Sequence, residues 1–188
     1  NGDVACDHYH RYKEDVKTMA DIGLKAYRLS VAWPRIIPAG KGKVNDKGMD
    51  FYSKLVDELL KNKIIPFVTL YHWDLPQVLE DKGGWRNKDT SYAYADYAQE
   101  VMRALSDRVT NWMTFNEMIC SSNLGYLDGV HAPGAKEDAG VFGNVVHNLL
   151  LAHGLGVQAL RGSAKKKPDV GLAHNASVYI PKTNSAED

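Results

Sequence analysis

The apolar positions of this chain follow two alternating patterns. Four stretches place apolar side chains three and four residues apart, the spacing of one face of a helix, and four shorter stretches are almost continuously apolar or β-branched, as buried strands are. The first pattern predicts helices over residues 9–22, 47–61, 92–105 and 141–160. The second predicts strands over residues 26–31, 64–71, 111–115 and 170–173, with loop from residue 175 onward.

Two helix ends can be assigned from single residues. Gly23 follows the first predicted helix and is expected to end it, because glycine readily adopts the left-handed conformation that closes many helices. Asp46 precedes the second helix and is predicted to be its N-cap, where a side-chain oxygen accepts a free backbone N–H.

Alternating helices and strands indicate an α/β protein, and strands without polar alternation are typical of a parallel sheet buried on both faces. Two architectures fit this pattern: an open doubly wound sheet and a closed (β/α)8 barrel. The sequence lacks the GxGxxG and GxxxxGK turns after its predicted strands. Their absence argues against the commonest nucleotide-binding forms of the open sheet.

Polar side chains gather where the predicted strands end, which favours the barrel. His72 and Trp73 follow the second strand, Asn116 and Glu117 follow the third, and Arg28 lies inside the first. Barrel enzymes build their active sites at this end of the strands, whereas an open sheet binds mainly at one crevice. The four units use almost all 188 residues, and a complete barrel needs about 250. The sequence therefore predicts a single domain, residues 1–188, that is part of a (β/α)8 TIM barrel.

Composition narrows the class of partner. The chain has 23 Lys+Arg and 23 Asp+Glu, so its net charge is zero, which argues against a nucleic-acid partner. Apolar runs in the sequence do not approach membrane-spanning length, so no membrane partner is expected. Cys6 and Cys120 are too few for a disulfide framework, which favours a cytoplasmic setting. The first residue is Asn1 rather than Met, so we expect residues to be missing before it.

Glu117 is the strongest candidate for chemistry. A carboxyl group half enclosed by aromatic side chains stays protonated nearer to neutral pH and can donate its proton to a leaving group. His72 and Trp73 combine a hydrogen-bonding ring with a flat apolar ring, a pair that suits the hydroxyls and C–H faces of a sugar. Arg28 lies in the middle of a strand and needs a carboxylate partner if the barrel interior encloses it. Each also has a structural interpretation, as a surface carboxylate, a core ring or an arginine that extends to solvent.

A metal site is the weaker alternative. Cys6, His8 and His10 alternate within one short segment, but a second ligand cluster with metal spacing does not accompany them. His147 and His153 are six residues apart on a predicted helix, so they do not share a face. The sequence predicts no metal and no other cofactor.

Three segments together resemble glycoside hydrolase family 1, the β-glucosidase family. They are YRLSVAWPRIIP (27–38), TLYHWDLPQVLEDKGGW (69–85) and WMTFNE (112–117). The similarity extends over nearly the whole chain. It implies a retaining β-glycosidase on a (β/α)8 barrel that acts on a β-glucoside or a related oligosaccharide.

The resemblance also implies roles for individual residues. Glu117 matches the general acid/base of the family, and Asn116 matches the asparagine that contacts the sugar 2-hydroxyl. His72 and Trp73 match residues that line the site for the sugar ring. Arg28 matches the arginine that pairs with the catalytic nucleophile.

Three departures qualify the match. Met118 stands where the family usually has proline, which puts the rigidity of that loop in question. The strand with the family's sugar-binding glutamine and the TENG-like nucleophile motif are both missing. By this matching the chain holds barrel strands two to five, and we expect it to need the rest of the barrel for activity. A 6-phospho-β-glycosidase and a non-catalytic relative that binds sugar or protein remain as alternatives.

Overall fold

The structure, a computed structural model, describes residues 5–176, 178, 180–183 and 185. Its centre is one sheet in which consecutive strands pair in parallel, in the order β1-β2-β3-β4. The strands are β1 (Ala26–Ser30), β2 (Ile65–Tyr71), β3 (Asn111–Asn116) and β4 (Asp169–Ala173). The strand order never reverses, as it would at the switch point of a doubly wound sheet. The α/β class, the four strands and their parallel pairing are as predicted.

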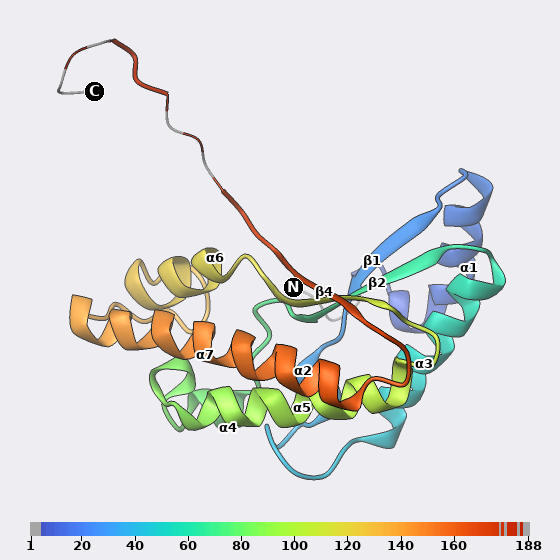
Figure 1. Ribbon diagram of the computed structural model, residues 1–188, viewed down its shortest axis with the longest axis horizontal. Coiled ribbons are helices and arrows are strands. Elements are labelled where there is room, and N and C mark those ends of the chain that lie inside the picture. Colours follow the sequence, from blue (N-terminus) through green and yellow to red (C-terminus); the bar gives the residue numbers. More distant parts are fainter. Residues whose placement is uncertain (1–4, 177, 179, 184, 186–188) are drawn as a thin grey trace.

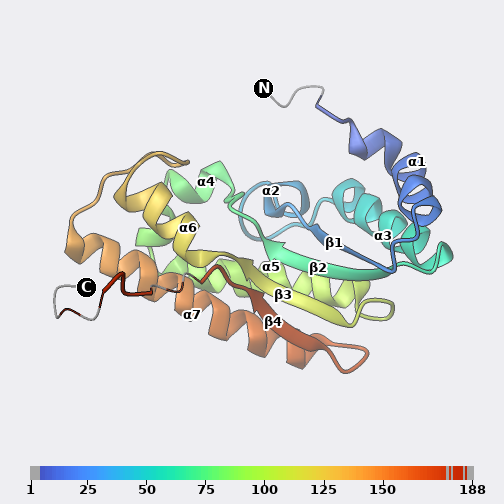
Figure 2. The same cartoon turned by 90° about the horizontal axis from the view of Figure 1, so that it is seen from above.

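A long helix precedes each strand. These helices are α1 (His8–Asp21), α3 (Asp46–Lys61), α5 (Asp89–Leu105) and α7 (Ala139–Ser163). Each packs against the next in the series, with the most extensive contact between α5 and α7. Figures 1 and 2 show α5 and α7 running side by side along the sheet, with α1 and α3 together at the end near β1. Repeated strand–helix units that wind in one direction are the building plan of a (β/α)8 barrel.

Five short helical turns were not predicted. They lie in the loops that follow the first three strands, at the carboxyl ends of those strands. They are α2 (Trp33–Ile36), α4 (Gln77–Glu80), η1 (Gly84–Arg86), α6 (Met118–Ser122) and the π-helical turn η2 (Asn123–Leu127). Turns of three to five residues are too short to show a helical period in the sequence.

The core lies between the helices and the sheet. The apolar stripes predicted for α3 and α5 are buried, whereas Tyr9 on the stripe of α1 is 43% exposed. The expectation that the strands are buried on both faces is wrong for β1 and β4. In β1 only Leu29 is buried, because the inner face of the sheet and the outer edges of β1 and β4 have no packing partner among the described residues.

The two predicted helix ends have different outcomes. Gly23 has φ +85° and donates its N–H to Ala20, while Leu24 donates to Met19, which is the expected left-handed helix end. The prediction of Asp46 as an N-cap is wrong. Asn45 is the extended residue before α3, and its side chain donates to the Arg35 carbonyl instead of capping the helix.

Gly48 lets the start of α3 pass close to the end of α2. A Cβ atom at this position would lie within van der Waals overlap of the Arg35 carbonyl oxygen, which is backbone and cannot move aside. We expect Gly48→Ala to lower the free energy of unfolding by about 2 kcal/mol, although alanine is normally the better helix former. The matched control is Gly154→Ala in α7, where a Cβ meets nothing within 4 Å. Urea unfolding should show the control stabilised by about 0.5–1 kcal/mol. Equal effects of the two substitutions would contradict the close approach.

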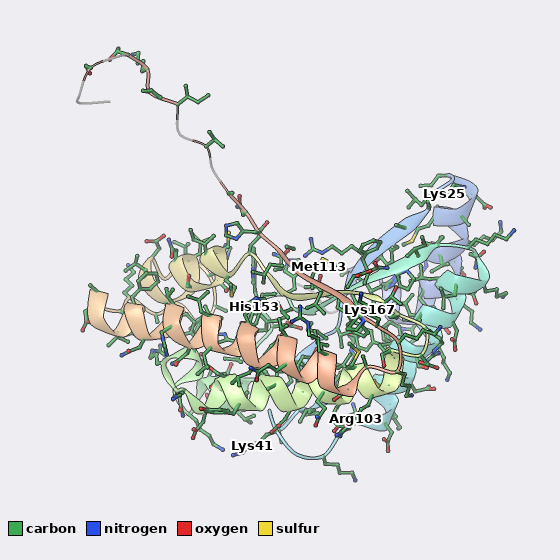
Figure 3. All side chains as sticks on the ribbon, in the orientation of Figure 1. Lys25, Lys41, Arg103, Met113, His153 and Lys167 are labelled. Atoms are coloured by element: carbon green, nitrogen blue, oxygen red, sulfur yellow. The ribbon has the colours of Figure 1, made fainter. Side chains whose placement is uncertain are left out.

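Helix α7 corrects the expectation that nothing in the chain approaches membrane-spanning length. It is long and apolar enough to cross a membrane, judged by length and composition alone. In the structure one of its faces packs on α5 and β3. Asn148 donates to the backbone carbonyls of Trp85 and Arg86, and His153 projects toward the sheet, where its Nδ1 lies 2.8 Å from Thr114 Oγ1 (Figure 3). Burial lowers the pKa of His153, as expected for an imidazole packed between helix and strand.

Candidate active site

Two residues just beyond β2 and β3 have left-handed backbone conformations. Trp73 has φ +74° and Glu117 has φ +40°. Neither is glycine, and such conformations cost about 1–3 kcal/mol each unless the surroundings hold them. They cluster at functional sites, so the backbone indicates this edge of the sheet independently of the side chains.

A polar network connects the inner face of the first three strands. Arg28 on β1 donates from Nε to Thr69 Oγ1 at 2.9 Å and from Nη2 to Asn116 Oδ1 at 2.5 Å. Both of these partners of Arg28, the Thr69 hydroxyl and the Asn116 amide, are neutral, and the structure describes no carboxylate bonded to it. The carboxylate partner expected for Arg28 is therefore not among the described residues, and the guanidinium lies on the exposed inner face.

An irregularity in β3 brings Asn116 into this network. Met113 lies on the inner face, where its sulfur is 3.8 Å from Thr69 Oγ1. Strict alternation would turn Asn116, three residues later, to the opposite face. The pairing of β3 with β4 shifts register between Met113 and Asn116, and a shift of this kind re-aims the side chain. Asn116 consequently points at Arg28 and is only 4% exposed.

Trp73 is held against the end of β3. Its indole N–H donates to the backbone carbonyl of Asn116 at 3.0 Å. Its ring centre lies 5.2 Å from that of His72 and 5.6 Å from that of His131, a residue in the loop after η2. A cavity of about 280 Å³ opens beside it, lined by Trp73, Ser121, His131 and Ala132.

His72 faces the network from the end of β2. Burial and the nearby charge of Arg28 lower its pKa, while Glu117 acts in the opposite direction. The imidazole is therefore neutral at pH 7 and has one donor and one acceptor nitrogen, which suits a hydroxyl ligand. With Arg28 and Thr69, His72 lines a larger cavity of about 560 Å³ that passes along β1, where His8 of α1 and Phe51 of α3 form part of its opposite wall.

Glu117 joins β3 to α6 and is half-buried. Its backbone N–H donates to the Ala173 carbonyl at 2.7 Å, which ties it to the end of β4. Its carbonyl accepts the N–H of Cys120, and the Cys120 thiol lies beside its carboxyl group. Burial and this neighbouring carboxyl raise the pKa of Cys120, so the thiol stays protonated. Met118, where proline was expected, is the first residue of α6, and the bond from Glu117 to Ala173 fixes the turn without proline.

The structure thus brings all five predicted residues, Arg28, His72, Trp73, Asn116 and Glu117, to the same edge of the sheet. The sequence analysis missed Thr69, whose hydroxyl accepts a hydrogen bond from Arg28. It also missed His131, which lies in a loop without a regular sequence pattern. It also gave no role to Asp74, whose carboxyl group is mostly buried although it follows His72 and Trp73 directly. A buried carboxyl group cannot be recognised from a sequence in which aspartate is common in turns.

The Cys6, His8 and His10 segment is arranged differently from a metal site. His8 Nδ1 lies 2.6 Å from Asp15 Oδ2, and His10 Nδ1 lies 2.6 Å from Asp7 Oδ1. Over the described residues, three His, Cys, Asp or Glu side chains do not come together anywhere as a metal ion requires. The two histidines pair with carboxylates on and beside α1.

The chain matches known proteins along its whole length. The family described as Glycosyl hydrolase family 1 matches residues 1–188. Beta-glucosidase A of Acetivibrio thermocellus is 51% identical over 187 residues, 100% of this chain and 41% of that protein. Thermostable beta-glucosidase B of Thermobispora bispora is 57% identical over 179 residues, 95% of this chain and 36% of that protein. The family 1 β-glucosidase of Thermotoga maritima in complex with isofagomine lactam superposes with a TM-score of 0.95 at 45% identity, covering 100% of this chain and 42% of that one.

Proposed function

The chain belongs to glycosyl hydrolase family 1, and we propose that it forms the acid/base half of a retaining β-glucosidase. It spans about 40% of the length of the relatives it matches, and its fold is a four-strand part of a (β/α)8 barrel. The observation that carries the proposal is the placement of Glu117. It is a half-buried carboxyl residue in a strained turn, directly after the Asn116 that Arg28 binds. The relatives reported above are β-glucosidases, which supports a plain glucoside as substrate over a phosphorylated one.

The proposed chemistry needs two carboxyl groups about 5–5.5 Å apart. Glu117 protonates the glycosidic oxygen while a second carboxylate attacks the anomeric carbon and forms a glycosyl–enzyme bond. Glu117, now deprotonated, takes a proton from the water that hydrolyses this bond. We propose that the second carboxylate comes from the rest of the barrel, where the unpaired charge of Arg28 would hold it ionised.

The sugar-binding roles follow from the hydrogen-bonding capacity of the site. Neutral His72 offers a donor and an acceptor to a sugar hydroxyl, and we propose that the amide of Asn116 contacts the 2-hydroxyl. The Trp73 ring offers an apolar surface to the C–H face of the sugar. We further propose that the chain needs the remaining strands, since the outer edges of β1 and β4 are unpaired within the described residues. The free thiols of Cys6 and Cys120 support a cytoplasmic location.

A chimeric barrel tests the function directly. Residues 1–188 would replace the matching segment of the Acetivibrio β-glucosidase, which supplies the missing strands. We expect this chimera to hydrolyse aryl β-glucosides and to release glucose first as the β-anomer, observed by proton NMR, because two displacements restore the original configuration. The chain alone is expected to show no turnover. Release of the α-anomer first, or turnover by the chain alone, would contradict the mechanism, and a folded but inactive chimera would contradict the function.

A further inference from the structure

Asp74 is a carboxyl group next to the proposed sugar-binding rings, and its side chain is turned toward α2. It follows His72 and Trp73 at the end of β2, yet its side chain is mostly buried against α2. The carboxylate accepts the backbone N–H of His72 at 3.3 Å. The backbone N–H groups of Asp74 itself and of Trp33, at the start of α2, lie near enough to lower its pKa. One side chain therefore faces both the end of β2 and the first turn after β1.

The bond from His72 spans the strained residue of the site. The N–H of His72, immediately before Trp73, donates to the carboxylate of Asp74, immediately after it. The backbone of Trp73 between them is left-handed, at φ +74°, which a tryptophan does not adopt without support. On the other side, the indole N–H is held by the Asn116 carbonyl. The turn is thus fixed at its backbone by Asp74 and at its ring by β3.

We propose that Asp74 is a positioning residue of the sugar site: its carboxylate holds the left-handed turn that aims His72 and Trp73 at the inner face of the sheet. The inference rests on the proposed function, because the site positioned is the proposed sugar site. Asp74 does not touch the sugar in this arrangement. It acts through the two rings that do, and geometric precision of this kind has large effects on catalysis.

The groups around Asp74 offset part of the cost of burying its negative charge. Arg35 on α2 is the cation that faces it, and the other ionisable groups around it are the phenols of Tyr52 on α3, Tyr71 on β2 and Tyr97 on α5. Burial raises the pKa of Asp74 to about 6, despite the backbone N–H groups and Arg35, which lower it.

The consequence for stability follows from the sign of this shift. The folded chain binds this proton more tightly than the unfolded chain, so the contribution of Asp74 to stability falls as pH rises from about 4 to about 6. The Asp74 carboxylate lowers the stability of the fold at neutral pH. Its presence at this position is therefore better explained by its role in holding the turn than by a contribution to stability.

The first experiment uses the chain itself, labelled with nitrogen-15 at tryptophan and histidine only. With four Trp and seven His the spectrum is sparse. We expect the backbone N–H signals of Trp33 and His72 to titrate together with a midpoint near pH 6, as the carboxylate that both N–H groups face gains a proton. Trp33 is the discriminating probe, because its N–H faces Asp74 and lies on a different loop from the His72 ring. Trp33 and His72 signals without a common midpoint would overturn the inference, and this measurement needs no variant.

The second experiment compares Asp74→Asn with Asp81→Asn, an exposed aspartate after α4 that serves as control. In the chain, Asp74→Asn should abolish the titration and make the Trp73 indole N–H exchange at least about tenfold faster, while Asp81→Asn changes neither. In the chimeric barrel, Asp74→Asn should lower kcat/KM about tenfold, and Asp74→Glu should restore part of it.

These experiments distinguish a failure of the proposed function from a failure of the proposed role of Asp74. An inactive wild-type chimera would refute the proposed function, whereas the titration and the indole exchange would still decide the role of Asp74 in the turn. An active chimera in which Asp74→Asn leaves both kcat/KM and indole exchange unchanged would refute the positioning role alone.

Discussion

Replacing Glu117 with Gln in the chimeric barrel is expected to lower kcat/KM by about 10²–10⁴-fold for β-glucosides with poor leaving groups. Glutamine keeps the shape of the side chain but has no proton to give to the glycosidic oxygen. A leaving group such as dinitrophenolate departs without a proton, so its first step should lose less than about tenfold. The measurement is kcat/KM over a series of aryl glucosides, and the expected signature is a much steeper dependence on the pKa of the leaving phenol.

The second half of the cycle supplies an independent check. Without a general base, water reacts slowly with the glycosyl–enzyme, so the variant should release a burst of phenol and then slow down. Azide attacks without a base and should restore turnover, giving the β-glucosyl azide. The matched control is Glu14→Gln, which should leave all rates unchanged. Glu14 is an exposed glutamate on α1 whose carboxylate accepts from Arg11 Nε at 3.3 Å. Equal losses for poor and good leaving groups would contradict the acid role of Glu117.

Much of the fold could be predicted because the helices are amphipathic and the strands are apolar. The stripes of α3 and α5 cover complete packed faces, so their burial follows from spacing alone. The predictions that were wrong concern features that depend on tertiary contacts, which the spacing of apolar residues does not encode. The inner face of β1 is exposed because it lacks partners among the described residues, and Asn45 rather than Asp46 precedes α3 because its amide is used by the Arg35 carbonyl.

The site shows the same division. Arg28, His72, Trp73, Asn116 and Glu117 could be selected from the sequence because parallel strands bring their carboxyl ends together. The geometry that aligns them could not. The register shift in β3 and the left-handed backbones of Trp73 and Glu117 arise from tertiary contacts, in which non-glycine residues take conformations that their own propensities disfavour.

Replacing Trp33 with Ala is expected to lower the free energy of unfolding by about 3–5 kcal/mol. Trp33 is fully buried as the first residue of α2, and its ring stacks on Tyr97 with centres 5.1 Å apart. Its indole N–H also donates to the Gly40 carbonyl at 3.1 Å. Alanine leaves a cavity between α2 and α5 and removes the partner of that carbonyl. Since small domains are stable by only about 5–15 kcal/mol in total, the variant should be close to unfolding at room temperature.

A control variant distinguishes the effect of Trp33→Ala on unfolding from the effect of removing any aromatic ring. Tyr92→Ala on α5 removes a ring that is 47% exposed and should change the free energy of unfolding by less than about 0.5 kcal/mol. Trp33→Phe keeps the stacking on Tyr97 but loses the indole N–H, so its unfolding midpoint in urea should lie between those of the wild type and Trp33→Ala. A Trp33→Ala chain that unfolds at the same urea concentration as Tyr92→Ala would show that the loop after β1 is not anchored through this ring. In that case Asp74, which faces the Trp33 backbone N–H, would be fixing the turn to a mobile element rather than to the core.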